Sequence, residues 1–314
     1  MKENRYIFIK LVLVIVIFIT FLPVVLTIGA DIVKIPGNEI WLLVRGDDIG
    51  FAHGANMAFI KSFQDGILSS AELMVPPGWF NEGVKILKEN PELEAGVHLT
   101  LTSEWFNYRW GPVGPIGKNS TIVDEDGYFF QRTEKNSIFE KLFNTNYCFV
   151  ESDFNLKEVE TELRAQIEKA IKKIPRINHI SCHMGAAVAT PELKNLVGEL
   201  AEEYGLVPDW KIRDIAEGVS LWSVPVEEKI DSLLYHLQHM QPGQLYYLVV
   251  HPGINTPEMR AVNSPGYEAD VHMAEHRAAV TEMLTHPKVR GFIKKRNIKI
   301  VNHQYIIDKA LLCN

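Results

Sequence analysis

Short apolar runs alternate with amphipathic segments from about residue 40 onward, and this alternation constrains the fold more than any other feature. Runs such as Ile40–Arg45, Ala95–Leu101 and Gln244–Val250 have the length and composition of buried strands. Between such runs, residues 156–174 place an apolar side chain at every third or fourth position, as in a helix with one buried face. Strands that alternate with helices predict a parallel sheet with crossover helices.

The other expected elements continue this alternation. We expect strands at Ala71–Val75, Ile177–Cys182, Val207–Ile212 and Ile298–Asn302, and helices at Gly54–Gly66, Trp79–Lys88, Glu192–Tyr204, Glu227–Met240 and Glu268–Leu284. This pattern amounts to about seven strand–helix units, which we expect to form a single domain over residues 31–314. The length of 314 residues suits one α/β barrel or one large doubly wound domain.

Residues 103–150 interrupt the alternation. This segment contains Trp105, Tyr108, Trp110 and the run Gly111-Pro112-Val113-Gly114-Pro115, and it shows no regular period. Connections of this length are uncommon within a domain unless they have a function or structure of their own. We therefore interpret the segment as an insertion over one end of the domain. Its aromatic side chains are candidates either for stacking on a ligand or for a small core of their own.

The first thirty residues have the pattern of an export signal. Lys2, Arg5 and Lys10 lead into the apolar run Leu11–Ala30, which ends in the small residues of Thr27-Ile28-Gly29-Ala30. The run also has about the 20 residues that a membrane-spanning helix needs, so an uncleaved signal anchor is the alternative to a signal peptide. We expect a periplasmic or extracellular protein, or one attached to the inner membrane and facing outward.

Charge and cysteine content argue against two classes of site. The chain carries 32 Lys and Arg against 39 Asp and Glu, a net charge of −7, so we expect no nucleic-acid partner. Its cysteines, Cys148, Cys182 and Cys313, are too few and too widely spaced for a disulfide framework or a cysteine-based zinc site.

Polar side chains lie at the ends of four expected strands. Asp47 and Asp48 follow the first strand, His98 lies late in the third, and His183 and His251 follow two later strands. Active sites of (β/α) barrels are built at the carboxyl ends of the strands. The alternatives are turn or helix-cap roles for the aspartates and a hydrogen-bonded core position for His98. Taken together, carboxylate and imidazole groups without a thiolate favour a divalent cation.

Several short motifs follow one another in a fixed order along the chain: Leu43-Val44-Arg45-Gly46-Asp47-Asp48-Ile49-Gly50, Gly54-Ala55-Asn56, Gly66-Ile67-Leu68-Ser69-Ser70, Leu73-Met74, Gly96-Val97-His98-Leu99-Thr100-Leu101-Thr102, Asn178-His179-Ile180-Ser181-Cys182-His183 and His251-Pro252-Gly253. In this order they resemble the YdjC-like carbohydrate deacetylases, a group that includes chitooligosaccharide deacetylases. The resemblance extends from about residue 40 to the C-terminus. It implies an incomplete (β/α) barrel related to the polysaccharide deacetylases.

The resemblance also implies a site and a reaction. Carried over by position, Asp48, His98 and His183 bind one divalent cation, Mg²⁺ or Zn²⁺, while Asp47 is the catalytic base and His251 the acid. The implied substrate is an N-acetylated mono- or oligosaccharide, whose acetamido group is hydrolysed. The cation supplies Lewis acidity and lowers the pKa of water, Asp47 takes the water proton, and His251 protonates the departing amine.

Further side chains are candidates for substrate binding. Trp105, Tyr108 and Trp110 are candidates for stacking on sugar rings, with core packing as the alternative. His179 is a further candidate for substrate binding. Its spacing from His183 is that of a metal-binding pair on a helix, but a strand is expected here, which weakens that interpretation.

Two positions depart from the family pattern Thr-His-x-Asp-x-His-x-His. Ser181 occupies the aspartate position and Gly185 the position of the last histidine. The first change removes a carboxylate that could orient a ligand histidine or bind substrate. Two alternatives therefore stay open, a metal-dependent hydrolase of another amide or ester, and an exported carbohydrate-binding protein without turnover. The intact Asp47 argues against the second alternative, because binding alone needs no base.

Overall fold

The computed structural model describes residues 35–117, 120–134, 148–212, 215–219, 221–262 and 273–312. The expected export signal at residues 1–30 lies outside these ranges, as do Cys313 and the beginning of the expected helix Glu268–Leu284. Within the described ranges, no helix is both long enough and apolar enough to span a membrane.

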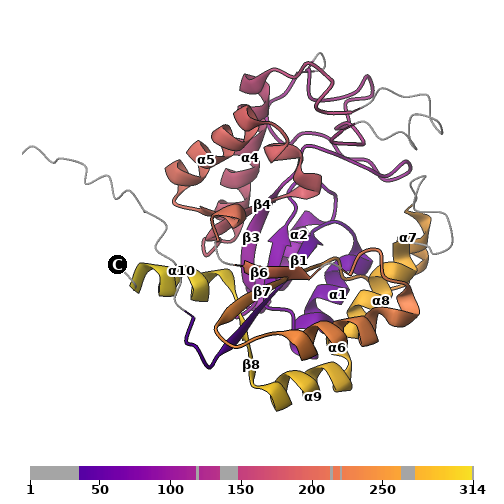
Figure 1. Ribbon diagram of the computed structural model, residues 1–314. Helices are drawn as coiled ribbons and strands as arrows, with labels where there is room; N and C mark the ends of the chain where they lie inside the picture. Colours follow the sequence, from indigo (N-terminus) through magenta and orange to yellow (C-terminus); the bar gives the residue numbers. More distant parts are fainter. Residues whose placement is uncertain are drawn as a thin grey trace, which may run out of the picture. The chain divides into compact units, whose positions relative to one another are not determined.

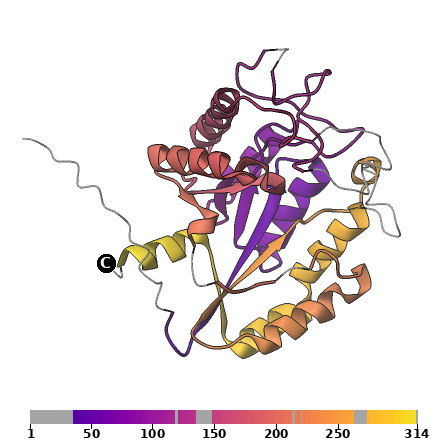
Figure 2. The ribbon, with the colours of Figure 1, turned by 45° about the horizontal axis from the view of Figure 1, so that its top comes forward.

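Among the described residues, one parallel sheet contains eight strands in the order β5-β4-β3-β2-β1-β7-β6, with β8 paired to β1 outside this order. One edge of β1 pairs with β7, whereas its other edge pairs with β8 over its first half and with β2 over its second half. The sheet curls without closing, since β5 and β6 end the order, and this is the expected incomplete barrel (Figures 1 and 2). The strands are β1 Ile40–Ile49, β2 Ser70–Leu73, β3 Glu94–Leu99, β4 His179–Cys182, β5 Val207–Pro208, β6 Ile215–Val219, β7 Gln244–Val250 and β8 Ile298–Val301.

Helices follow most of the strands, as crossover connections between parallel strands require. Helix α4 packs against β3 and α5 against β5. Helices α6, α8 and α9 pack against one another (Figure 1). The α-helices are α1 His53–Gln64, α2 Phe80–Glu89, α4 Leu156–Lys173, α5 Pro191–Tyr204, α6 Lys229–His239, α7 Pro257–Ala261, α8 Met273–Thr285, α9 Pro287–Arg296 and α10 His303–Leu312. Short 3₁₀ turns lie at η1 His183–Val188, η2 Asp209–Lys211 and η3 Val226–Glu228.

Local capping explains the two helices that flank β4. The side chain of Asn155 accepts a hydrogen bond from the Lys157 amide at the start of α4. The side chain of Thr190 does the same for the Leu193 amide at the start of α5, where Pro191 occupies the first turn. Helix α5 ends at Gly205, which has a φ of +67° and so tolerates the left-handed conformation of the C-cap.

Three regions differ from the sequence-based expectations. Strand β1 continues through Asp47 and Asp48, which we expected in the turn after it. The expected strand Val207–Ile212 shortens to two residues, because Pro208 has no amide hydrogen to continue the ladder. Strand β6 and helices α7, α9 and α10 were not expected. Such short segments carry too few apolar residues to show a period in the sequence. Packing against neighbouring elements stabilises them instead.

The insertion at 103–150 has little regular structure where it is described. Two isolated bridges join Val123 to Phe129 and Arg132 to Cys148. Buried aromatic side chains from this segment, including Trp105 and Phe149, belong to the main hydrophobic core. The described part of the insertion is therefore packed into the domain.

Candidate active site

A bulge near the end of β1 places two adjacent aspartates in one site. Neighbouring residues of a strand normally point to opposite faces, which would separate Asp47 from Asp48. Here the pairing of β1 with β2 shifts register between Asp47 and Ile49, and Asp48 has a φ of +82°. As a result, His98 Nε2 lies 3.9 Å from Asp47 Oδ2 and 3.6 Å from Asp48 Oδ1. A positive φ at a residue other than glycine is unfavourable and tends to occur at functional sites.

The structure brings together the three residues that the sequence suggested as metal ligands. Asp48, His98 and His183 are buried, and each offers a ligand atom within 4.8 Å of the others. His183 Nδ1 lies 3.3 Å from Asp48 Oδ1, and the ring centres of His98 and His183 are 5.5 Å apart. Within the described part of the chain, Asp48 Oδ1 makes no hydrogen bond of good geometry. A buried carboxylate oxygen that faces two imidazole nitrogens fits a divalent cation.

Arg277 holds the other oxygen of Asp48. Its Nη2 donates to Asp48 Oδ2 at 2.7 Å, and its guanidinium lies 5.0 Å from the centre of the Phe51 ring. Burial alone would raise the pKa of Asp48, but Arg277 and His183 hold it well below its usual range. Asp48 therefore stays ionised, as a metal ligand must be. No sequence pattern indicated this role, because Arg277 lies on α8, far along the chain from Asp48.

Arg45 holds Asp47 in a similar way from within the same strand. Arg45 Nη2 donates to Asp47 Oδ2 at 2.7 Å, and Arg45 Nε lies 2.7 Å from Asp47 Oδ1. The same guanidinium donates to Asp209 at 2.5 Å and to the Tyr247 hydroxyl at 2.8 Å. Burial raises the pKa of Asp47 to about 7, although Arg45 opposes this change. A carboxylate with that pKa suits a general base near neutral pH.

Glu104 contacts the third candidate ligand. Its Oε2 lies 3.0 Å from His183 Nε2, on the side of the ring opposite to Asp48. Burial alone would lower the pKa of His183, but the carboxylates of Glu104 and Asp48 raise it to about 10. Carboxylates that bond the outer nitrogen of a ligand histidine fix its orientation. Glu104 lies at the start of the irregular insertion, and no pattern in the sequence marked it.

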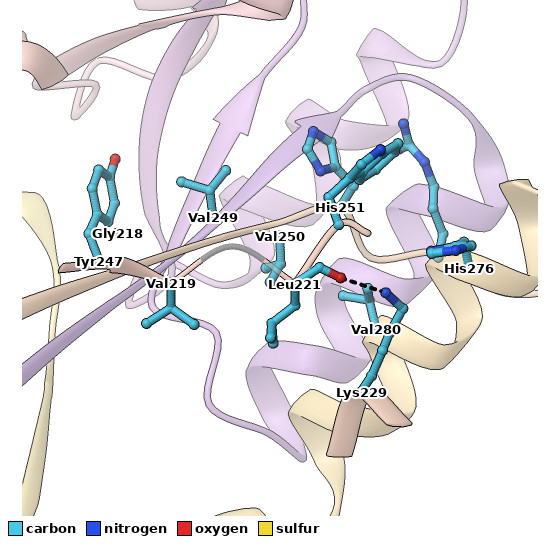
Figure 3. Close-up of a pocket in the computed structure, with 12 residues that line it drawn as sticks. Gly218, Val219, Leu221, Lys229, Tyr247, Val249, Val250, His251, His276 and Val280 are labelled. Carbon is cyan, nitrogen blue, oxygen red and sulfur yellow. Dashed lines mark hydrogen bonds between the residues drawn. The ribbon is translucent and has the colours of Figure 1, made fainter. Parts of the chain in front are cut away.

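His251 follows β7 and lies in the wall of a pocket of about 280 Å³ (Figure 3). Most of the side chains that line this pocket are apolar, among them Val250 and Val280. The indole of Trp222 meets the His251 ring edge to face at 5.3 Å, and Trp222 is 44% exposed. Burial lowers the pKa of His251 to about 4, so its imidazole is neutral at pH 7. A neutral imidazole has to gain a proton before it can act as an acid.

The three aromatic candidates of the insertion surround Phe51. The rings of Trp105, Tyr108 and Trp110 lie between 5.6 and 5.9 Å from the Phe51 ring. Trp105 and Trp110 are buried, and the Tyr108 hydroxyl donates to the Phe51 carbonyl at 2.7 Å. Burial of both indoles favours core packing, one of the two alternatives that the sequence left open. Trp222, which the sequence analysis did not single out, offers a more accessible aromatic surface beside His251.

His179 does not join the group around Asp48. It belongs to a second buried group with Glu72 and His303, and its Nε2 lies 2.7 Å from Glu72 Oε1. The rings of His179 and His303 are stacked 3.6 Å apart and 16° from parallel. Two such rings cannot both direct in-plane lone pairs at one ion, so hydrogen bonds account better for this second group. Complete burial of His179 also gives no support to a substrate-binding role.

Comparison with known proteins decides the family. The family model of YdjC-like proteins matches residues 41–295. The chain belongs to the YdjC-like family. A relative from Thermus thermophilus, named carbohydrate deacetylase, is 32% identical over an alignment of 280 positions that covers 81% of this chain and 89% of that protein. Another of the same name from Clostridium beijerinckii is 28% identical over an alignment of 271 positions that covers 84% of this chain and 99% of the relative.

A crystal structure from Enterococcus faecalis shares the fold of this YdjC-like chain. That protein, described as a cellobiose-phosphate cleavage protein, is 24% identical and covers 85% of this chain and 99% of its own. The TM-score is 0.63, which supports the half-barrel architecture.

The structure accounts for one of the two departures from the YdjC-like motif. Met184 and Gly185 have φ values of +50° and +66°, so the chain turns sharply in left-handed conformations directly after His183. Glycine adopts this conformation without strain. The other departure, Ser181, forms a hydrogen bond with His98.

Proposed function

We propose that this YdjC-like protein is a carbohydrate deacetylase that hydrolyses the acetamido group of N-acetylated sugars or oligosaccharides. The observation that carries the proposal is the convergence of Asp48, His98 and His183 beside Asp47. The curated relatives named carbohydrate deacetylase match more than four fifths of the chain, which supports the same activity.

Asp48, His98 and His183 would hold one divalent cation. Two imidazoles and one carboxylate favour Zn²⁺ over Mg²⁺, which prefers oxygen ligands. When bound, such a cation supplies Lewis acidity toward the acetamide oxygen and toward water.

Residues of the chain would move the protons. Asp47 Oδ2 accepts the proton of the attacking water, and Arg45 holds this carboxylate in place through two contacts of 2.7 Å. His251 delivers a proton to the departing amine nitrogen. Because its pKa of about 4 leaves it neutral beforehand, it first takes up the proton that the attacking water gave to Asp47, so that this proton ends on the amine and both side chains return to their starting state.

Acetate release tests the function directly. We expect the purified protein to release acetate from at least one member of a panel of N-acetylated mono- and oligosaccharides. Removing the cation with a chelator should lower the rate by about 10²-fold or more, and adding Zn²⁺ should restore it. Hydrolysis of acetyl esters alone, or sugar binding without release of acetate, would contradict the proposal.

A pH dependence of metal binding is expected because a proton competes with the cation for His183. With a pKa of about 10, His183 is protonated at pH 7 in the metal-free structure, whereas a ligand imidazole has to be neutral. Raising the pH removes this competing proton, so Zn²⁺ affinity should increase about tenfold per pH unit between about pH 6 and 8. Calorimetry in two buffers of different ionisation enthalpy should find about one proton released per ion. An affinity that does not change over this range would contradict the assignment.

A further inference from the structure

A chain of buried hydrogen bonds runs from His98 away from the cation site. His98 Nδ1 lies 2.7 Å from Ser181 Oγ, and Ser181 Oγ lies 2.6 Å from Glu72 Oε2. All three side chains are buried, and Glu72 and Ser181 are fully so. This chain connects strand β3 to β4 and then to β2.

Donor and acceptor counting fixes the direction of these bonds. A carboxylate only accepts hydrogen bonds, so the single hydroxyl hydrogen of Ser181 is committed to Glu72. Ser181 Oγ therefore accepts from His98, which requires a hydrogen on His98 Nδ1. In the neutral ring, the other nitrogen is then unprotonated. That nitrogen, Nε2, is the one that faces Asp47 and Asp48.

We propose that Glu72 is a positioning residue, which acts through Ser181 to hold His98 in the tautomer that presents an unprotonated Nε2 to the cation. The proposal rests on the metal site of the proposed function. It assigns to β2 the carboxylate that the family motif led us to expect at position 181, on β4.

The sheet makes this connection by leaving one position without a side chain. Glu72 is the register partner of Gly96 on β3, and His98 is the partner of Ser181 on β4. A Cβ atom at Gly96 would collide with Glu72 Oε2 and His179 Nε2. Because Gly96 has no side chain, the Glu72 carboxylate crosses over β3 and reaches Ser181.

The second oxygen of Glu72 is held as firmly as the first. Glu72 Oε1 accepts from Ser70 Oγ at 3.1 Å and lies 2.7 Å from His179 Nε2. Burial alone would raise the pKa of Glu72, but His179 brings it well below its usual range. The second buried group thus keeps Glu72 ionised and orients it toward Ser181.

The test uses the purified full chain, freed of metal, with Zn²⁺ as the probe. Ser181→Ala removes the link between Glu72 and His98 and should weaken Zn²⁺ binding 10- to 100-fold, the usual effect of losing an outer partner of a ligand. Ser70→Ala is the matched control, because it removes another hydroxyl from the same carboxylate without contact to His98. Its Zn²⁺ affinity should stay within about threefold of the original.

NMR of metal-free protein whose histidine rings are labelled with the nitrogen-15 isotope reports which ring nitrogen of His98 carries the proton. A merely structural role of Glu72 would not change this protonation pattern. The original protein should show His98 protonated at Nδ1 and not at Nε2, and Ser181→Ala should lose this preference. The double variant Glu72→Gln/Ser181→Asp moves the carboxylate from position 72 to position 181, where it can bond His98 directly. Its Zn²⁺ affinity should be at least about tenfold higher than that of Ser181→Ala.

Several results would overturn the proposal. They are full Zn²⁺ affinity in Ser181→Ala, no recovery in the double variant, and protonation of His98 at Nε2 in the original protein. The last measurement decides alone if Ser181→Ala does not fold. None of these readouts needs substrate, so a protein that binds Zn²⁺ but releases no acetate would refute the proposed function and leave the role of Glu72 intact.

Discussion

Replacing His183 with alanine is expected to abolish Zn²⁺ binding and acetate release together. The candidate site offers three protein ligands, and a catalytic zinc site needs all three to retain the ion. The loss of affinity should exceed about 100-fold, the upper range for changes outside the ligand shell. The measurement is metal content by elemental analysis beside the rate of acetate release.

His251→Ala is the matched control for this experiment. His251 is a histidine of the same site but does not belong to the group of candidate ligands. This variant should keep its metal and lose activity, with the smallest loss on activated aryl esters, whose leaving group needs no proton. Full metal content in His183→Ala would refute its assignment as a ligand, whatever happens to the rate.

Elements with clear ends and a strong period could be predicted from the sequence. Strand β7 has the bounds Gln244–Val250 that we expected, because the apolar run is flanked by Gly243 and Pro252. Helix α4 matches closely, since its apolar face follows the helical period and Asn155 caps it. Strand β6 could not be predicted, because it is a short edge strand stabilised by pairing with β7.

The site could be predicted only in part, for a related reason. Its candidate ligands lie at strand ends, which a linear pattern can locate. The groups that hold them come from distant segments, as Arg277 does for Asp48 across 229 positions. The bulge at Asp48 also breaks the alternation on which strand patterns rest. Arg45, which holds the proposed base Asp47, is close in the sequence instead, because an i, i+2 spacing places both side chains on one face of the strand.

Ser181 shows how a local departure can be misread. From the sequence alone, the change suggested the loss of a carboxylate that could orient a ligand histidine or bind substrate. The structure instead places the carboxylate of Glu72 one hydroxyl away from His98. Glu72 lies on another strand than Ser181. The two side chains meet only because of the register of β2, β3 and β4 and because Gly96 has no side chain between them.

Asp47→Asn is expected to lower kcat by about 10² to 10⁴-fold while the protein keeps its metal. The amide preserves the shape of the side chain and one oxygen, but it cannot take a proton from water. Because Asp47 does not belong to the group of candidate ligands, Zn²⁺ affinity should change little. The rate of acetate release at saturating substrate measures kcat, and calorimetric titration with Zn²⁺ measures metal affinity, so the two effects are separated.

The control has to remove a negative charge next to Arg45 without changing a residue that takes part in the reaction. Asp209→Asn does so, because Asp209 accepts from the same guanidinium at 2.5 Å but is absent from the contacts of His98 and His183. We expect this variant to retain kcat within about tenfold, since Asp47 can still accept the proton. Equal losses in both variants would mean that Asp47 acts by holding Arg45 rather than as a base. A rate near the original in Asp47→Asn would remove the base assignment altogether.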